Sequence, residues 1–179
     1  MTGKGHRLST TAFVLGTTGS VLAAVMSYMG STFPDSSEYM FFGKRRNRYH
    51  RRYTHWFVPW ALLAYVCFKR AGWIVPNLAN LIDGREAHRD VWACAGFWFA
   101  GCLLHILEDA WCGTVPFLRP WKRDVGLHVF HMSNKIGVMS RGEINFVLCS
   151  VGISLFAFMM RYFTLDSFMA FCVNLWRSI

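Results

Sequence analysis

The sequence predicts an all-α fold: a polytopic membrane helical bundle with a short N-terminal helical hairpin and three to four further helices, in a single integral membrane domain spanning residues 1–179. Hydrophobic residues make up 54% of the chain and charged residues 16%, which is less charge than a soluble domain of this length carries. The charges are also clustered, because segments 8–34, 91–104 and 144–160 contain no Asp, Glu, Lys, Arg or His. Uncharged apolar stretches of this length are typical of helices that cross a membrane.

The first apolar stretch, residues 8–34, is too long for one straight span. As a single helix it would measure roughly 40 Å at 1.5 Å per residue, against a hydrocarbon core of about 30 Å. Its middle, Gly16–Ser20, has weak helix propensity and good turn and capping residues. We therefore predict two helices, over 4–15 and 20–33, joined as a hairpin. The stretch is also too long for a removable signal peptide, and we expect none.

The remaining elements follow from the same pattern. A third helix is predicted from Trp56 to Phe68, with a possible extension to Val75, and it stops at Pro76. A polar connection follows over 77–90. The later elements are a fourth helix over 91–111, a basic loop over 112–143, a span over 144–162 and a short returning or interfacial helix over 165–176.

The predicted hairpin places the N-terminus, the 35–55 segment and the 112–143 loop on one side of the membrane. That side collects most of the positive charge: Lys4, Arg7, Lys44, Arg45, Arg46, Arg48, Arg51, Arg52, Arg119, Lys122, Arg123, Lys135 and Arg141. The positive-inside rule then predicts that this side faces the cytoplasm. The net charge is +9, and we expect the basic residues to bind anionic headgroups of membrane lipids rather than nucleic acid.

His105 and Asp109 are the first candidate functional pair. They are four residues apart on a predicted helix, so the imidazole and the carboxylate project from one face. Imidazole and carboxylate together suit zinc, manganese or iron. The alternative is a pair at a helix end in which Asp109 only orients His105. Ionisable residues inside a membrane segment are costly, however, and they usually mark a functional site.

Four more residues become ligands if they converge on this pair: His6, Asp35, His50 and His55. The hairpin returns Asp35 to the side that carries His6, and His55 lies at the start of the third helix, where Thr54 is a candidate cap. Each also has a simpler interpretation. His6 would be an exposed histidine near the terminus, and Asp35 a solvated loop residue. His50 and His55 would be histidines of a basic loop without a ligand role. Together the six predict a metal site at one face of the bundle.

The order of these motifs resembles the YdjM-like family, bacterial inner-membrane proteins described as LexA-regulated metal-dependent hydrolases. The motifs are Gly5-His6, Pro34-Asp35, His50-Arg51-x-x-Thr54-His55 and His105-x-x-x-Asp109, and the resemblance covers residues 5–143. The family usually shows Pro-Asp-x-Asp, whereas this chain has Glu38 one position later than the second acid. It commonly has Ser where this chain has Trp56. These departures favour one metal ion over two.

The resemblance implies a hydrolase of the bacterial inner membrane that uses a divalent metal, zinc in the first place, with manganese or iron as alternatives. A more distant likeness to the helical fold of zinc-dependent phospholipase C and related nucleases favours a phosphoester substrate, either a small molecule or a lipid. Glu38, or less well Glu108, is then the candidate general base, and Arg51 stabilises negative charge in the transition state. The alternative function is a non-catalytic protein that binds metal or lipid. The sequence favours no oligomeric state.

Overall fold

The computed structural model describes residues 1–43, 50–84, 87–131 and 138–162. Within these ranges the regular elements are helices, and β structure is limited to one isolated bridge between Val115 and Val125. The prediction of an all-α fold is therefore confirmed. In chain order the elements are α1 (Gly3–Thr18), α2 (Val21–Gly30), α3 (Phe33–Phe42), the 3₁₀ helix η2 (Tyr53–His55), α5 (Phe57–Ala71), α6 (Leu78–Asp83), α7 (Ala87–Cys112) and α8 (Arg141–Tyr162).

The N-terminal hairpin forms where it was predicted. Gly19, which follows α1, adopts the left-handed conformation with φ 70°, and glycine reaches this region without a steric penalty. The side chain of Ser20 then accepts a hydrogen bond from Ala23 N and caps α2. Helix α1 runs three residues beyond the predicted end at 15, and α2 ends at Gly30 rather than at 33.

Two short helices, α3 and α6, lie between the helices that were predicted. Pro34 lies in the first turn of α3 and so opens a helix, because proline lacks only an N–H that a first turn leaves unbonded anyway. Asn77 caps α6 within the predicted 77–90 connection, and the first turn of α7 also falls there. The third helix, α5, ends at Ala71, three residues beyond the predicted end at Phe68 and short of the extension to Val75. The predicted helix over 165–176 lies outside the described residues, as do Lys44, Arg45, Arg46, Arg48 and Lys135 of the predicted basic side.

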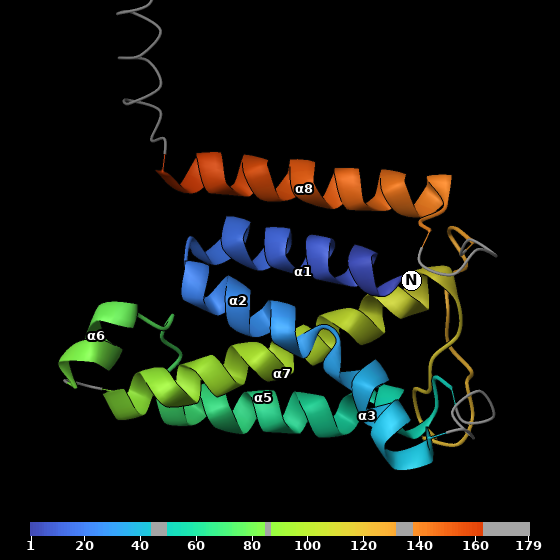
Figure 1. The fold of residues 1–179 in the computed structure, drawn as a ribbon, viewed down its shortest axis with the longest axis horizontal. Helices are drawn as coiled ribbons and strands as arrows, with labels where there is room; N and C mark the ends of the chain where they lie inside the picture. Colours follow the sequence, from blue (N-terminus) through green and yellow to red (C-terminus); the bar gives the residue numbers. More distant parts are fainter. Residues whose placement is uncertain (44–49, 85–86, 132–137, 163–179) are drawn as a thin grey trace, which may run out of the picture.

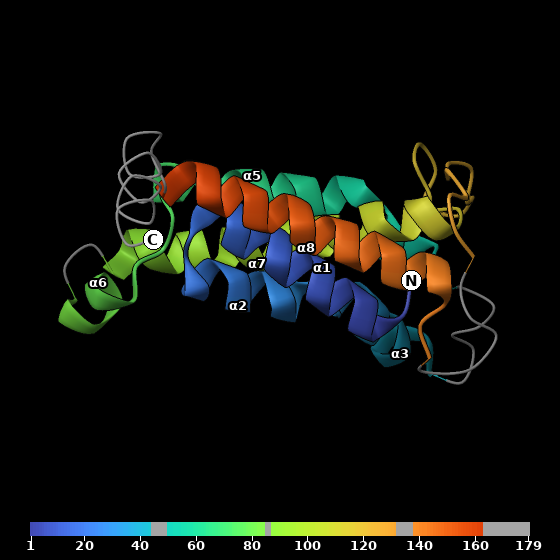
Figure 2. The ribbon, with the colours of Figure 1, turned by 90° about the horizontal axis from the view of Figure 1, so that it is seen from above.

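The long helices lie roughly side by side along the long axis of the molecule (Figures 1 and 2). Helix α7 packs against both α5 and α2, while α1 packs against both α2 and α8. Glycines allow the close contacts: a Cβ atom at Gly101 would lie 2.2 Å from Ser27 O, and one at Gly16 would lie 2.3 Å from Ser154 O. These contacts fix the positions of α1, α2 and α7, which carry much of the candidate site.

Helices α7 and α8 are long and apolar enough, by length and composition, to cross a membrane. The N-terminus, α3, η2 and the C-terminal end of α7 all lie at one end of the bundle, on the right in Figure 1. The hairpin returns the chain to the end where α1 begins, so α3 lies near the N-terminus. The candidate metal ligands are therefore found at this end of the bundle.

Candidate metal centre

Four elements contribute ionisable side chains to one end of the bundle. The N-terminal part of α1 carries His6, α3 carries Asp35, η2 ends at His55, and the last turns of α7 carry His105 and Asp109. Four of the five residues are almost completely buried, with relative exposures of 2% or less, and Asp35 is partly exposed. The predicted ligands from distant parts of the chain therefore converge on one buried centre.

The donor atoms of this centre surround a small space. His55 Nε2 lies 3.1 Å from His105 Nε2, 3.4 Å from Asp109 Oδ2 and 3.6 Å from Asp35 Oδ1. His105 Nε2 lies 3.7 Å from Asp109 Oδ2 and 4.0 Å from Asp35 Oδ1. Four ligands placed tetrahedrally about 2.0–2.1 Å from a zinc ion are separated from one another by about 3.3–3.4 Å. The observed separations are close to that spacing.

His6 adds a third imidazole to the centre. Its Nε2 lies 3.2 Å from Asp109 Oδ1, and its ring stacks on that of His105 with centroids 3.8 Å apart. His6, His105 and Asp109 each offer a ligand atom within 4.8 Å of the others, and so do Asp35, His55 and His105. The two groups share His105, so they form one centre rather than two separate sites.

Each of the three imidazoles uses its Nδ1 atom to contact a hydrogen-bond acceptor behind it. The acceptors are Glu108 Oε2 for His6 at 2.6 Å, Glu38 Oε1 for His55 at 3.1 Å, and the backbone carbonyl of Ser31 for His105 at 2.6 Å. Because these oxygens accept, each Nδ1 carries a proton, and Nε2 is the ring atom that faces the centre. Metal-bound histidines are oriented in this way by a carboxylate or carbonyl on the other ring nitrogen.

Glu38 is fully buried and connects His55 to the preceding turn. Its Oε1 accepts from Arg51 N at 2.7 Å and from Thr54 Oγ1 at 3.1 Å, while His50 Nδ1 lies 2.8 Å from its Oε2. Burial disfavours the charged carboxylate, but the hydrogen bonds from His50 and His55 outweigh it and hold the pKa of Glu38 well below its usual value. Thr54 contacts Glu38 and His55 and does not cap α5, which has no side-chain cap.

Glu108 has a part in the site that sequence reasoning missed. The sequence suggested that its side chain points off the face that carries Asp109. In the structure the Glu108 side chain contacts α1. Its carboxylate accepts hydrogen bonds from Ser9 Oγ and, at 3.2 Å, from Thr10 Oγ1, and it also contacts His6. Ser9 and Thr10 were the available signal, because buried hydroxyls need a partner, but their spacing does not identify that partner.

Arg51 lies at the edge of the centre in a strained conformation. Its φ of 55° places a non-glycine residue in the left-handed region, which costs about 1–3 kcal/mol and is typical of functional sites. This conformation directs the backbone N–H to Glu38 and the guanidinium Nη2 to Asp109 Oδ1, at 2.7 Å. The amino group of Met1 also lies 2.5 Å from Asp109 Oδ1.

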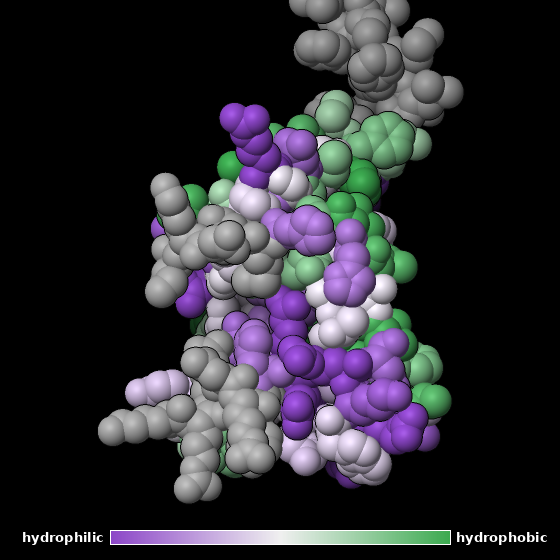
Figure 3. All heavy atoms as spheres, turned by 90° about the vertical axis from the view of Figure 1, so that its right-hand side faces the viewer, coloured by the Kyte–Doolittle hydropathy of each residue, from purple (hydrophilic) through white to green (hydrophobic). Residues whose placement is uncertain are grey.

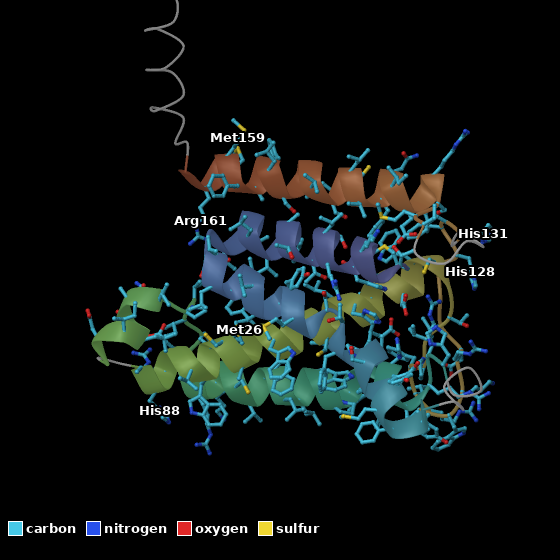
Figure 4. All side chains as sticks on the ribbon, viewed as in Figure 1. Met26, His88, His128, His131, Met159 and Arg161 are labelled. Carbon is cyan, nitrogen blue, oxygen red and sulfur yellow. The ribbon has the colours of Figure 1, made fainter. Side chains whose placement is uncertain are left out.

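His50 lies at the rim, with a side chain that is 36% exposed. It forms a further group with Asp35 and Glu38, whose ligand atoms lie within 4.8 Å of one another. His128 and His131, which are both exposed, lie at the same end of the molecule, and His88 lies at the opposite end (Figure 4). None of these three belongs to the groups of ligand atoms found among the described residues.

The centre gathers negative charge in a buried place. Asp35, Glu38, Glu108 and Asp109 supply carboxylates, and buried carboxylates need compensating cations or protons. Burial alone would lower the pKa of His55, yet its contacts with Asp109 and Glu38 raise that pKa to about 9. Without a metal, protons on histidine balance part of this charge, and a divalent cation can replace them. The residues present therefore fit a metal ion.

The model of one protein family, described as YdjM inner membrane protein, matches residues 1–168, a range that includes every residue of the centre. No curated protein and no solved structure matches the chain.

Proposed function

The chain belongs to the YdjM family of inner membrane proteins, and we propose that it is a membrane-bound, metal-dependent hydrolase that acts on phosphoesters. One observation carries this proposal. Three imidazoles, each with Nδ1 already held by an acceptor, direct Nε2 toward two carboxylates in a buried space with the dimensions of a metal site. Histidines that served only to fill the core would not need this arrangement.

His55, His105, Asp35 and Asp109 are the proposed ligands, with His6 as a further one and His50 at the rim. A mixed set of nitrogen and oxygen donors favours zinc, with manganese or iron as alternatives. When bound, a divalent ion supplies a water of lowered pKa and polarises the phosphoryl oxygen.

The other residues have proposed roles that follow from their contacts. The Arg51 guanidinium contacts Asp109, so it is placed to bind a phosphate group next to the centre and to stabilise negative charge there. Glu38 already accepts several hydrogen bonds and has a low pKa, so its contacts favour holding His55 in place. Its action as general base stays a prediction, as does that of Glu108.

The metal content of the detergent-purified protein tests the site. Elemental analysis should find about one equivalent of zinc, manganese or iron in the wild type and little in the double variant His105→Ala/Asp109→Ala. The matched control is His128→Ala/His131→Ala, which removes two exposed histidines from the same end of the molecule and should keep the metal. A folded wild-type protein that holds no metal, even after reconstitution with each of these ions, contradicts the proposal.

Turnover distinguishes the hydrolase from the alternative, a metal- or lipid-binding protein without activity. We expect hydrolysis of phosphodiesters or phosphomonoesters that a chelator abolishes and that Arg51→Met reduces while the metal content stays unchanged. A wild-type protein that holds metal but hydrolyses nothing in a panel of lipid and nucleotide phosphoesters supports the alternative instead.

A further inference from the structure

An apolar pocket lies directly beside the candidate metal centre. Helix α3, η2 and the first turn of α5 line this open pocket, and its apolar walls include Phe33, Met40, Tyr53 and Trp60. Its volume of about 600 Å³ falls within the range of roughly 300–1,000 Å³ that is usual for small-molecule sites. Aromatic and thioether side chains make this space suitable for hydrocarbon.

The pocket and the metal centre share a boundary. Ser37 and Thr54 form the polar edge of the pocket. Thr54 Oγ1 donates to Glu38 and lies 3.1 Å from His55 Nδ1, and Ser37 immediately precedes Glu38 on α3. A molecule in the pocket therefore lies next to the residues that orient a proposed metal ligand.

The outer surface of α3 is apolar as well. Tyr39, Met40 and Phe41 are consecutive, and their relative exposures are 68%, 70% and 71%. Such a cluster is unfavourable in water but suits the interface of a bilayer, where a helix buries its apolar face among acyl chains. The same helix directs Asp35 and Glu38 inward to the centre. Helix α3 thus separates an apolar surface from a polar centre.

The end of the molecule that carries the centre shows both kinds of surface. Polar side chains gather over the middle of this end, and hydrophobic ones lie mostly along one edge (Figure 3). The guanidinium of Arg51 lies at the edge of the centre, and exposed Lys122 and Arg123 belong to the loop at this end. A ligand with an anionic head and a hydrocarbon tail matches this combination of charge and apolar space.

We propose that the pocket between α3, η2 and α5 binds a hydrocarbon chain of a membrane lipid whose phosphate-bearing headgroup lies at the metal centre. The assignment of the headgroup rests on the proposed function, while the site of the chain rests on the pocket itself. The substrate class is thereby narrowed from phosphoesters in general to phospholipids or other lipid phosphates that enter from the surrounding bilayer.

Photo-crosslinking of the full chain in vesicles tests this assignment. The probe is phosphatidic acid with a diazirine in the middle of one acyl chain, diluted into phosphatidylcholine, and labelled residues are mapped by mass spectrometry after illumination. We expect labels on pocket residues, Met40, Tyr53 and Trp60 above all, at several times the density found on exposed residues of α8 such as Leu155 and Phe156.

Two neighbouring substitutions provide a matched comparison. Met40→Glu introduces a charge into the pocket, whereas Tyr39→Glu introduces it on an equally exposed side chain of the same helix that does not line the pocket. Labelling of Tyr53 and Trp60 should fall at least fivefold in Met40→Glu and should stay within twofold in Tyr39→Glu. Met40→Trp, which adds volume without charge, should lower the labelling too.

Two results overturn the inference: equal label density on the pocket and on α8, or equal losses in the two glutamate variants. The second would mean that α3 only associates with the membrane surface. Metal content measured on the same samples keeps the two proposals apart. A metal-free protein that still labels the pocket would contradict the hydrolase while the lipid site remains.

Discussion

At the scale of single residues, Glu38 and Glu108 occupy equivalent places behind two of the imidazoles. Each carboxylate contacts the Nδ1 atom of a histidine whose Nε2 faces the centre, His55 for Glu38 and His6 for Glu108. Each also accepts hydroxyl hydrogen bonds, from Thr54 and from Ser9 and Thr10 respectively. The hydroxyls fix the carboxylates, and the carboxylates in turn fix the rings.

Glu38→Gln should therefore weaken metal binding without abolishing it. The amide keeps the size of the side chain but loses the charge that favours the Nδ1–H tautomer of His55, and such changes behind a metal ligand typically cost about 10–100-fold in affinity. Competition with a chelator of known affinity measures the effect. Asp124→Asn, the same change at an exposed loop residue of this end, should leave the affinity unchanged. Equal affinities in the two variants would show that Glu38 does not hold His55.

Arg51→Met should separate binding of the phosphate from binding of the metal. Methionine fills similar space but removes the guanidinium that contacts Asp109. If Arg51 binds the phosphate, the apparent affinity for inorganic phosphate or vanadate should fall at least tenfold while metal content is kept. Arg123→Met, at an exposed residue of the same end, is the control. A loss of metal in Arg51→Met would instead assign the residue to holding the centre together.

The sequence identified the side chains that converge on the centre but not the groups that orient them. His105 and Asp109 share a helical face by spacing alone, and the hairpin brings His6 and Asp35 to the same end. The partner of His105 Nδ1 is a backbone carbonyl, that of Ser31, and no residue type marks a carbonyl. The role of Glu108 depends on α1 packing against α7, which no local pattern specifies.

At the scale of elements, the close approach of α2 and α7 places His105 against the end of α2. Gly101 allows this approach, since a Cβ atom there would lie 2.2 Å from the backbone oxygen of Ser27. One helical turn further along α7, His105 reaches the Ser31 carbonyl. Any increase in the separation of the helices would lengthen that hydrogen bond.

Gly101→Ala should therefore lower both stability and metal affinity. Backbone atoms cannot move aside as a flexible side chain can, and overpacking of this kind costs about 1–3 kcal/mol. Gly152→Ala on α8 is the matched control, because nothing lies within 4 Å of a Cβ atom there. Replacing a helical glycine by alanine at such an open position gains up to about 1 kcal/mol. Thermal unfolding in detergent compares the two, and similar midpoints would contradict the packing that we describe.

The elements that the sequence predicted well are those whose boundaries have a local cause. Gly19 and Ser20 are a helix end and a helix cap within an uncharged stretch, so the hairpin could be predicted. Pro34 is ambiguous in sequence, because proline can follow one helix or open the next. In the structure it lies in the first turn of α3, the helix whose Asp35 and Glu38 contact His55.

At the scale of the whole molecule, positive charge is distributed unequally between the two ends. Described basic residues toward the end of the candidate metal centre are Lys4, Arg7, Arg51, Arg52, Arg119, Lys122, Arg123 and Arg141, and those toward the other end are Lys69, Arg70, Arg89 and Arg161. Arg161 donates to Thr17 O at the turn of the N-terminal hairpin (Figure 4). The excess at the end of the centre favours a cytoplasmic location for it.

Asp83 and Lys122 should accordingly lie on opposite sides of the inner membrane. Asp83 is the last residue of α6, and Lys122 lies in the loop after α7. Both are exposed, and α7 separates them. In bacterial cells with a permeabilised outer membrane, a membrane-impermeant maleimide should label Asp83→Cys directly. It should label Lys122→Cys only after the inner membrane is opened as well.

The wild-type chain provides the background for this experiment, since Cys149 is exposed and Cys94 is half-buried, both within helices that are candidate spans. The reverse pattern would place the metal centre outside the cytoplasm, where the substrate would have to be a lipid of the outer leaflet. Labelling of both variants in intact inner membranes would mean that α7 does not cross. In that case α3 and the apolar pocket beside the centre would be the main contact with the bilayer, and the lipid chain would have to enter from one leaflet only.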